Sequence, residues 1–272
     1  GVAMANFLYW LDTETKSHQL NEMLLIKKLE NFRRQTGELQ DISFNTICGA
    51  GSNGAIIHYK ANIKSSKNLR ANEVVLIDSG GQYKYGTTDI TRTLVIGNPP
   101  KNFELPYTSV LKGLIAISQI CWPEGLSGRE LDSVARLALW KHGLDYEHGT
   151  GHGVGSYLDV HEGPHAMSKR NSVPLLPGML ITCEPGFYKA GEFGIRIENL
   201  LLVKKSTRST VNIQSLLEME TLTLVPIDTK PAKLDLLTRD EKLWIDNYHK
   251  NILKKLSPKL SPKVRDWLIK KC

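Results

Sequence analysis

Apolar residues recur at helical spacing in three stretches of the chain. They fall every three or four positions from residue 17 to about residue 35, and Gly37 follows as a stop signal. A second stretch of this kind lies near residues 103–121. The third begins with Ser127 and Glu130, which form an S-x-x-E capping box directly before the apolar face. The pattern therefore predicts three amphipathic helices.

Other runs are rich in β-branched residues or alternate apolar and polar positions, which is typical of strands. They cover residues 41–48, 73–78, 91–96, 178–184, 194–203 and 219–227. These strands mingle with the helices without a regular β-α-β rhythm. The pattern predicts the α+β class, with a largely antiparallel or mixed sheet.

The end of the chain differs in composition from the rest. The last 24 residues hold eight Lys or Arg against one Asp, and the whole chain has a formal net charge of +7. Apolar positions interleave with these charges as they do in short amphipathic helices, so a solvated helix face is favoured over a nucleic-acid surface. We expect a catalytic domain over residues 1–226 and a helical extension over residues 227–272.

Composition limits the class of protein. With 41% hydrophobic and 23% charged residues, the 272-residue chain is typical of a globular protein with a real core. No apolar run suggests a membrane span, and no N-terminal signal pattern is present. The four cysteines are scattered without a C-x-x-C pair, which favours a reducing compartment, so we expect a cytoplasmic protein without disulfides. Because the chain opens on Gly1 inside an apolar pattern, we expect upstream domains to be missing.

The stretch HGTGHGVGSYLDVHEGP, residues 148–164, holds three histidines on a glycine-rich backbone. It overlaps two motifs that fail on structural grounds. HEGPH, residues 161–165, fits the H-E-x-x-H zinc motif, but Gly163 and Pro164 would break the helix that this site needs. GTGHGVG lacks the G-x-G-x-x-G spacing and follows a helix, so a dinucleotide loop is excluded as well.

Four carboxylates lie at or near the ends of predicted strands: Asp78, Asp89, Glu184 and Glu198. A hairpin would bring Asp78 close to Asp89, and alternation in GIRIEN puts Arg196 and Glu198 on one face. Burying several carboxylates together is costly unless something cationic lies among them. Arg92 and Arg196 could form an ion-pair network, but four carboxylates with one histidine also match the hard ligands of two divalent metal ions.

With these neighbours, the chain resembles the aminopeptidase P and prolidase family, whose catalytic domain has the pita-bread fold. The resemblance thus implies a curved, mostly antiparallel sheet flanked by helices. The motifs that carry the resemblance are LIDSGGQYKYGTTDITRT, HGTGHGVG, CEPGFY and GIRIEN, and NGAIIHY, HGTGHGVGSYLDVHEGP and TLTLVPI favour its larger, three-domain Xaa-Pro aminopeptidases. The resemblance spans nearly the whole chain, apart from the N-terminal creatinase-like domains that such members carry. It implies five metal ligands: Asp78, Asp89, His152, Glu184 and Glu198.

The resemblance also implies a chemistry. Two divalent ions, most simply Mn²⁺ but also Co²⁺, Zn²⁺ or Fe²⁺, would activate a water for attack on the bond before proline. Glu184 would shuttle the proton to the leaving nitrogen. His58, His148 and His161 would serve as catalytic and substrate-binding residues, with Arg196 and Tyr188 as further substrate-site residues. We expect peptides with proline at the second position as substrates, a homodimer, and neither nucleic acid nor membrane as a partner.

Several alternatives remain at this level. A prolidase acting on Xaa-Pro dipeptides or a methionine aminopeptidase would have the same fold. A third alternative is a noncatalytic binding module on this fold, although such relatives lose metal ligands that this chain retains. A fourth is a protein that binds nucleic acid through its basic tail. The other histidines, His18, His142, His165 and His249, match nothing in the family, and we predict that they lie on the surface.

Overall fold

The structure is a computed structural model that describes residues 1–15, 19–208 and 215–272. Its α-helices are α1 (Val2–Glu14), α2 (Glu22–Arg34), α3 (Glu104–Gln119), α4 (Gly128–Trp140), α5 (Arg239–Leu256) and α6 (Pro262–Lys271), joined by 3-10 turns η1 (Gly51–Ala55), η2 (Leu234–Leu236) and η3 (Ser257–Lys259). Its strands are β1 (Leu39–Ile42), β2 (Ile47–Ala50), β3 (Glu73–Ser79), β4 (Gly81–Tyr83), β5 (Gly86–Thr87), β6 (Ile90–Ile96), β7 (Cys121–Pro123), β8 (Gly151–His152), β9 (Ala166–Met167), β10 (Leu180–Cys183), β11 (Gly186–Lys189), β12 (Phe193–Arg196), β13 (Asn199–Lys205) and β14 (Leu216–Thr221).

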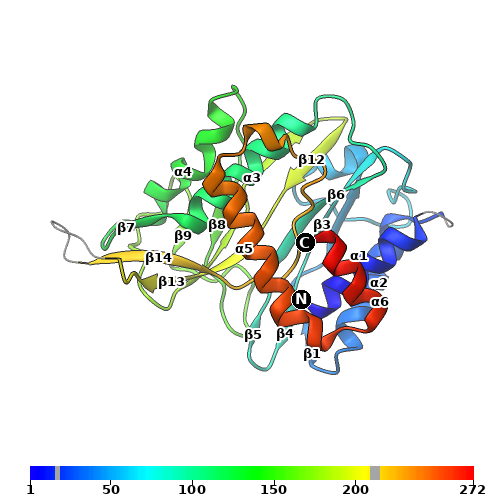
Figure 1. Cartoon of the computed structure of the whole chain (residues 1–272), viewed down its shortest axis with the longest axis horizontal. Helices are drawn as coiled ribbons and strands as arrows, with labels where there is room; N and C mark the ends of the chain where they lie inside the picture. The colour runs from blue at the N-terminus through cyan, green and yellow to red at the C-terminus, as the bar shows by residue number, and fades with distance from the viewer. Residues whose placement is uncertain (16–18, 209–214) are drawn as a thin grey trace.

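Every strand pair among the described residues is antiparallel. The pairs form small sheets, of which the largest has the order β10-β13-β14-β7 and another the order β2-β3-β6. Helices α3 and α4 pack together on one side, whereas α1, α2 and α6 gather at the other end of the molecule (Figure 1). The predicted α+β class with a mostly antiparallel sheet is confirmed.

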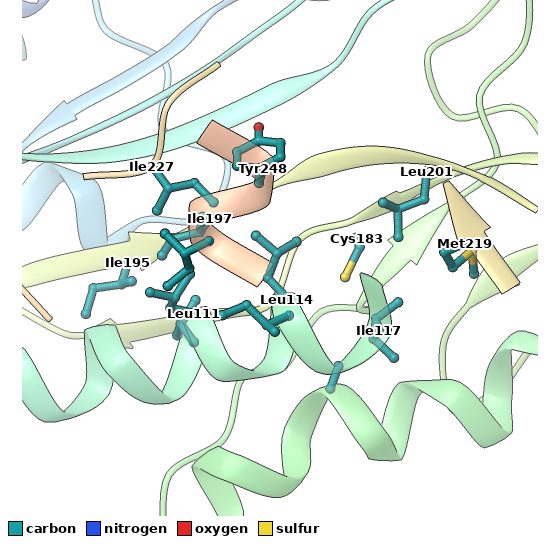
Figure 2. Close-up of a cluster of buried hydrophobic side chains, with 14 of the residues drawn as sticks. Leu111, Leu114, Ile117, Cys183, Ile195, Ile197, Leu201, Met219, Ile227 and Tyr248 are labelled. Carbon is teal, nitrogen blue, oxygen red and sulfur yellow. The ribbon is translucent and has the colours of Figure 1, made fainter. Parts of the chain in front are cut away.

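The main apolar core lies between α3 and the strands that lead to the polar cluster described below. Leu111, Leu114 and Ile117 of α3 face side chains of β12 and β13, and Tyr248 of α5 closes the same core (Figure 2). These helix residues are fully buried. Burial of such side chains contributes roughly 1.5–3 kcal/mol each, so α3 holds the strands firmly from behind.

Helix boundaries follow local capping. The helix predicted from residue 17 begins at Glu22, because the Asn21 side chain caps it by accepting from the Leu24 N–H at 2.9 Å. Residues 17 and 18 of that prediction lie outside the described residues. The capping box of Ser127 and Glu130 is present at the start of α4, as predicted.

Two predicted strands are divided and two are shorter, one of them being residues 178–184, which form β10 alone. Residues 41–48 form the end of β1 and the start of β2 with a bend between them, and residues 194–203 divide into β12 and β13 around Ile197 and Glu198. Beyond Thr221, the stretch predicted as strand to residue 227 belongs to no strand. Strand propensity and apolar–polar alternation continue across these bends, so the sequence pattern does not show where a strand is interrupted.

The C-terminal helices pack against the rest of the chain. Tyr248, Ile252 and Leu256 of α5 belong to the same apolar core as α3, and Trp267 of α6 donates to the Asp12 carboxylate of α1 at 2.8 Å. The interpretation of this basic end as amphipathic helices is confirmed, since lysines alternate with these buried positions. No helix of the described residues combines the length and apolar character needed to cross a membrane.

Two histidines correct the prediction that the unmatched ones lie on the surface. His165 and His249 are buried, and only His142 is exposed, whereas His18 lies outside the described residues. His165 Nε2 lies 2.7 Å from the Leu180 carbonyl oxygen, and His249 Nε2 accepts from the Ile227 N–H at 3.2 Å. Both are buried residues held by a backbone contact through Nε2, although His165 Nδ1 has no hydrogen-bond partner among the described residues. Sequence spacing does not reveal this role.

Candidate metal and peptidase site

One pocket of about 640 Å³ brings the predicted polar residues together. Its lining includes the five expected metal ligands and four other predicted site residues: Asp78, Asp89, His152, Glu184, Glu198, His58, His148, His161 and Arg196. Tyr188 does not line the pocket, but its hydroxyl contacts Arg196 and His148. Four acids that are up to 120 positions apart therefore share one cavity.

Strand geometry explains the convergence. β3 and β6 pair antiparallel with Asp78 opposite Thr91, so Asp89, two residues before Thr91, lies near Asp78 as the predicted hairpin requires. The connection is longer than a simple turn, because β4 and β5 form a second hairpin within it. Glu198 joins from the break between β12 and β13, where its N–H donates to the Thr91 carbonyl at 3.1 Å.

The ligand atoms are close enough to share cations. His152 Nε2 lies 3.4 Å from both Asp89 Oδ2 and Glu184 Oε1. One ligand atom from each of Asp89, His152 and Glu198 lies within 4.8 Å of the other two. Asp78 Oδ1 and Glu198 Oε1 are buried and have no hydrogen-bond partner among the described residues. Such atoms normally have partners, and a divalent cation would satisfy both of them.

The electrostatics of the cluster point the same way. Burial raises the pKa of Asp89 and of Glu198 well above the usual range, and neighbouring carboxylates raise both further. Burial also raises the pKa of Glu184. Arg196 supplies the nearby positive charge, with Nη2 at 2.7 Å from Asp78 Oδ2 and Nε at 3.9 Å from Glu184 Oε2. One guanidinium does not balance four carboxylates, so the donor set fits divalent metal ions.

The ring of His152 is oriented for ligation. Its Nδ1 lies 2.9 Å from the Gly153 carbonyl oxygen, and a nitrogen in that position carries the proton. In the neutral ring Nε2 then keeps its lone pair, and this is the nitrogen that faces the carboxylates. Glycines pack the segment closely, because a Cβ on Gly151 would overlap the Thr182 carbonyl oxygen. The bare backbone therefore lets β8 approach β10, which places His152 beside Glu184.

A hydrogen-bond relay links Arg196, Tyr188 and His148. Arg196 Nη1 donates to the Tyr188 hydroxyl at 2.7 Å, and that hydroxyl lies 2.8 Å from His148 Nε2. His148 Nδ1 lies 2.7 Å from the Gly149 carbonyl oxygen and so carries the ring proton. Burial, followed by the charge of Arg196, lowers the pKa of His148 to about 4. The ring is therefore neutral at neutral pH, and both of its nitrogens already have partners.

The lowered pKa of His148 gives a testable pH dependence. The unfolded imidazole titrates near 6.5 and the folded one near 4, so protons favour the unfolded chain. The stability that the neutral His148 ring contributes to the folded state is fully present above pH 6.5 and is lost as the pH falls towards 4. We expect the free energy of unfolding, measured by urea denaturation at pH 7 and 5.5, to fall less in His148→Gln than in wild type. The exposed His142→Gln variant should keep the wild-type dependence, and an equal dependence in both variants would contradict the assignment.

His161 and His58 both line the pocket. The His161 ring packs edge-on against His152, with centroids 4.2 Å apart, and its backbone N–H donates to Asp159 Oδ1 at 3.1 Å. Burial and the neighbouring His152 lower the pKa of His161. His58 is exposed in the turn after η1. Residues 161–165 form no helix, which agrees with excluding the H-E-x-x-H zinc site.

Sequence reasoning missed the hydroxyls that orient the acids. Thr91 Oγ1 donates to Glu198 Oε2 at 2.7 Å and accepts from Arg196 Nε at 3.2 Å. Thr182 Oγ1 donates to Glu184 Oε1 at 3.1 Å. The alternation of side chains could have identified both hydroxyls. Thr91 comes two positions after Asp89 and Thr182 two positions before Glu184, a spacing that places side chains on the same side of an extended chain. The pocket also includes Phe44, Asn45, Lys60 and Asp159, for which no pattern was available.

Comparison with known proteins agrees with this geometry. The family model described as metallopeptidase family M24 matches residues 1–205, and that of the C-terminal region of peptidase M24 matches residues 215–272. A protein named aminopeptidase P1 from Lotus japonicus is 41% identical over 295 residues, which cover 100% of this chain and 45% of the relative.

Two solved structures are similar as well. The X-prolyl aminopeptidase of Caenorhabditis elegans, described as a cytosolic enzyme with a di-nuclear active site, has a TM-score of 0.94 at 40% identity and covers 100% of this chain and 45% of its own. The prolidase of Pyrococcus furiosus has a TM-score of 0.66 at 27% identity, covering 81% of this chain and 61% of its own. The predicted pita-bread fold is confirmed. The chain spans less than half the length of the Lotus japonicus and C. elegans aminopeptidases.

Proposed function

Because the chain belongs to metallopeptidase family M24, we propose that it is a dinuclear metal-dependent Xaa-Pro aminopeptidase. It would hydrolyse the bond between an N-terminal residue and a following proline. The observation that carries the proposal is the pocket in which four carboxylates converge on His152, with buried oxygens of Asp78 and Glu198 that lack a protein partner. Relatives named Xaa-Pro aminopeptidase and the di-nuclear site of the C. elegans structure support it.

The ligand set is proposed as Asp78, Asp89, His152, Glu184 and Glu198. Four oxygen donors and one nitrogen favour a hard or borderline divalent ion, so Mn²⁺ is proposed, with Co²⁺, Zn²⁺ and Fe²⁺ as the other ions that such ligands accept. When bound, two such ions supply an activated water and polarise the scissile carbonyl.

The protein groups around this water have separate tasks. We assign Glu184 as the proton shuttle, since its Oε1 is held by Thr182 beside His152 and can take a proton from the attacking water. It would then pass that proton to the proline nitrogen, which becomes an amine as the bond breaks. His161 and His58, which both line the pocket, are assigned to the substrate carbonyl and its developing negative charge.

Arg196, Tyr188 and His148 are assigned to a supporting role as well as to substrate binding. Arg196 fixes Asp78 through one nitrogen and Tyr188 through another. A direct contact between His148 and substrate requires that its Nε2 exchange the Tyr188 hydroxyl for a substrate group. The relay thus offers a way for substrate binding to affect the orientation of a metal ligand.

Substrate length separates this function from its closest alternative. Metal-loaded protein should release the first residue from an Xaa-Pro-Xaa peptide, and release should be much weaker from an Xaa-Pro dipeptide. A preference for the dipeptide would instead indicate a prolidase, and cleavage only after an initial methionine would indicate a methionine aminopeptidase. Absence of hydrolysis in the full-length, metal-loaded protein would favour a noncatalytic module.

A further proposal concerns the domain organisation of the protein and the compartment in which it acts. We propose a catalytic unit over residues 1–226 with a helical extension over residues 227–272, acting as a homodimer in the cytoplasm. The cytosolic description of the C. elegans enzyme and four cysteines without a disulfide support the compartment. We propose no nucleic-acid or membrane partner, and salt-sensitive nucleic-acid binding that persists after chelation would refute the first of these.

A further inference from the structure

The carboxylate of Glu22 is fully buried at the first residue of α2, outside the metal cluster. Its Oε1 accepts from the Ala50 N–H at 2.7 Å and from Asn53 Nδ2 at 2.9 Å. Its Oε2 accepts from the Tyr59 hydroxyl at 2.9 Å and from the Lys67 N–H at 3.0 Å. A buried charge is normally paired or fully hydrogen-bonded, and four donors from the 50–67 region satisfy this one.

These donors lie on the segment that forms one wall of the pocket. Ile57, His58 and Lys60 all line the cavity. Tyr59 lies between the last two of them, but its side chain is buried and its hydroxyl is bonded to Glu22. The bond to Glu22 holds the Tyr59 side chain inward, whereas its two neighbours, His58 and Lys60, line the pocket.

Apolar packing contributes little to holding this segment in place. Among residues 55–67, Tyr59 is the only buried side chain, and Ile56 and Ile63 are 56% and 94% exposed. The ends of the segment are also tied to α2, since the Glu22 N–H donates to the Lys67 carbonyl at 3.1 Å. The wall therefore depends on hydrogen bonds centred on Glu22 more than on apolar packing.

We propose that Glu22 is a positioning residue whose buried carboxylate fixes residues 51–67, and with them His58, against the peptide-binding pocket. The inference rests on the proposed function for the identity of the substrate, but the anchoring itself does not. Glu22 touches no pocket atom and acts through Tyr59 and the backbone of Ala50 and Lys67.

Glu22→Gln tests the proposal with little change in side-chain size. The amide turns one acceptor oxygen into a donor, which then faces two donors in the cradle. We expect KM for an Xaa-Pro-Xaa peptide to rise roughly tenfold, with the metal content of wild type. Tryptic cleavage of the native protein after Lys60 and Lys64 should become faster. Glu30→Gln is the matched control, because Glu30 lies on the same helix and pairs only with Arg34 at its surface.

Tyr59→Phe provides a second variant if Glu22→Gln does not fold. It keeps the ring and removes the hydroxyl, so the rise in KM and the faster tryptic cleavage should both appear but be smaller. The double variant should show a smaller effect than the sum of the two single variants, because both substitutions remove the same contact. Loss of kcat at unchanged KM, with cleavage at Lys60 and Lys64 as slow as in Glu30→Gln, would overturn the proposal. Faster cleavage in a protein without Xaa-Pro peptidase activity would retain the anchor and refute the proposed function instead.

Discussion

Glu184→Gln should reduce kcat for an Xaa-Pro-Xaa peptide by at least about 10³-fold. General acid–base catalysis contributes roughly 10²–10⁴-fold, and this carboxylate also belongs to the proposed ligand set. Its Oε1 lies 3.4 Å from His152 Nε2 and accepts from Thr182, so an amide in its place can neither take a proton nor replace the charge. Steady-state kinetics in saturating Mn²⁺, with circular dichroism to verify folding, measures the effect.

Glu162→Gln is the matched control for that experiment. Glu162 is the acid of the HEGPH stretch and would be the general base of an H-E-x-x-H protease, yet it does not line the pocket. We expect near wild-type kcat from this variant. If Glu162→Gln were inactive and Glu184→Gln active, the assignment of the proton shuttle would be wrong.

Chelation should abolish activity and lower thermal stability together. Four carboxylates with one nearby guanidinium repel one another when no cation lies between them, as the raised pKa values of Asp89 and Glu198 indicate. A ligand at 100 times its dissociation constant stabilises the folded state by about 2.7 kcal/mol per site. Differential scanning fluorimetry with a chelator, and then with excess Mn²⁺, should show a drop in Tm and its recovery.

Glu198→Gln tests whether the Mn²⁺-dependent rise in Tm comes from ions bound at the proposed site or from ions bound elsewhere. Glu198 Oε1 has no protein partner, whereas its Oε2 accepts from Thr91. The amide can keep the Thr91 contact through its carbonyl oxygen, so the fold should survive while the Mn²⁺-dependent rise in Tm shrinks. A rise equal to that of wild type would mean that the ion binds elsewhere.

The sequence located the proposed metal ligands better than it located the residues around them. Asp78, Asp89, Glu184 and Glu198 could be singled out because acids at the ends of apolar strands need a cation, and the strand ends do converge on one pocket. The division of residues 194–203 into β12 and β13 could not be foreseen, because its bend depends on the contact from the Glu198 N–H to the Thr91 carbonyl across 107 positions.

Roles that depend on long-range partners were also beyond the sequence. The burial of His165 and His249 follows from packing against Leu180 and Ile227, which no local pattern encodes. The same holds for Glu22, whose partners lie 28 to 45 positions away. Local patterns thus located helices, strands and chemistry-bearing residues, whereas tertiary hydrogen bonds determined how each side chain is used.

Counting bound metal ions tests the central claim most directly. Equilibrium dialysis of the purified chain against Mn²⁺, followed by elemental analysis, should give two ions per chain in wild type and fewer in Asp89→Asn. Two ions match the four carboxylates and His152 that share the pocket. A chain that binds no divalent ion, or an Asp89→Asn variant that binds as many as wild type, would contradict the account.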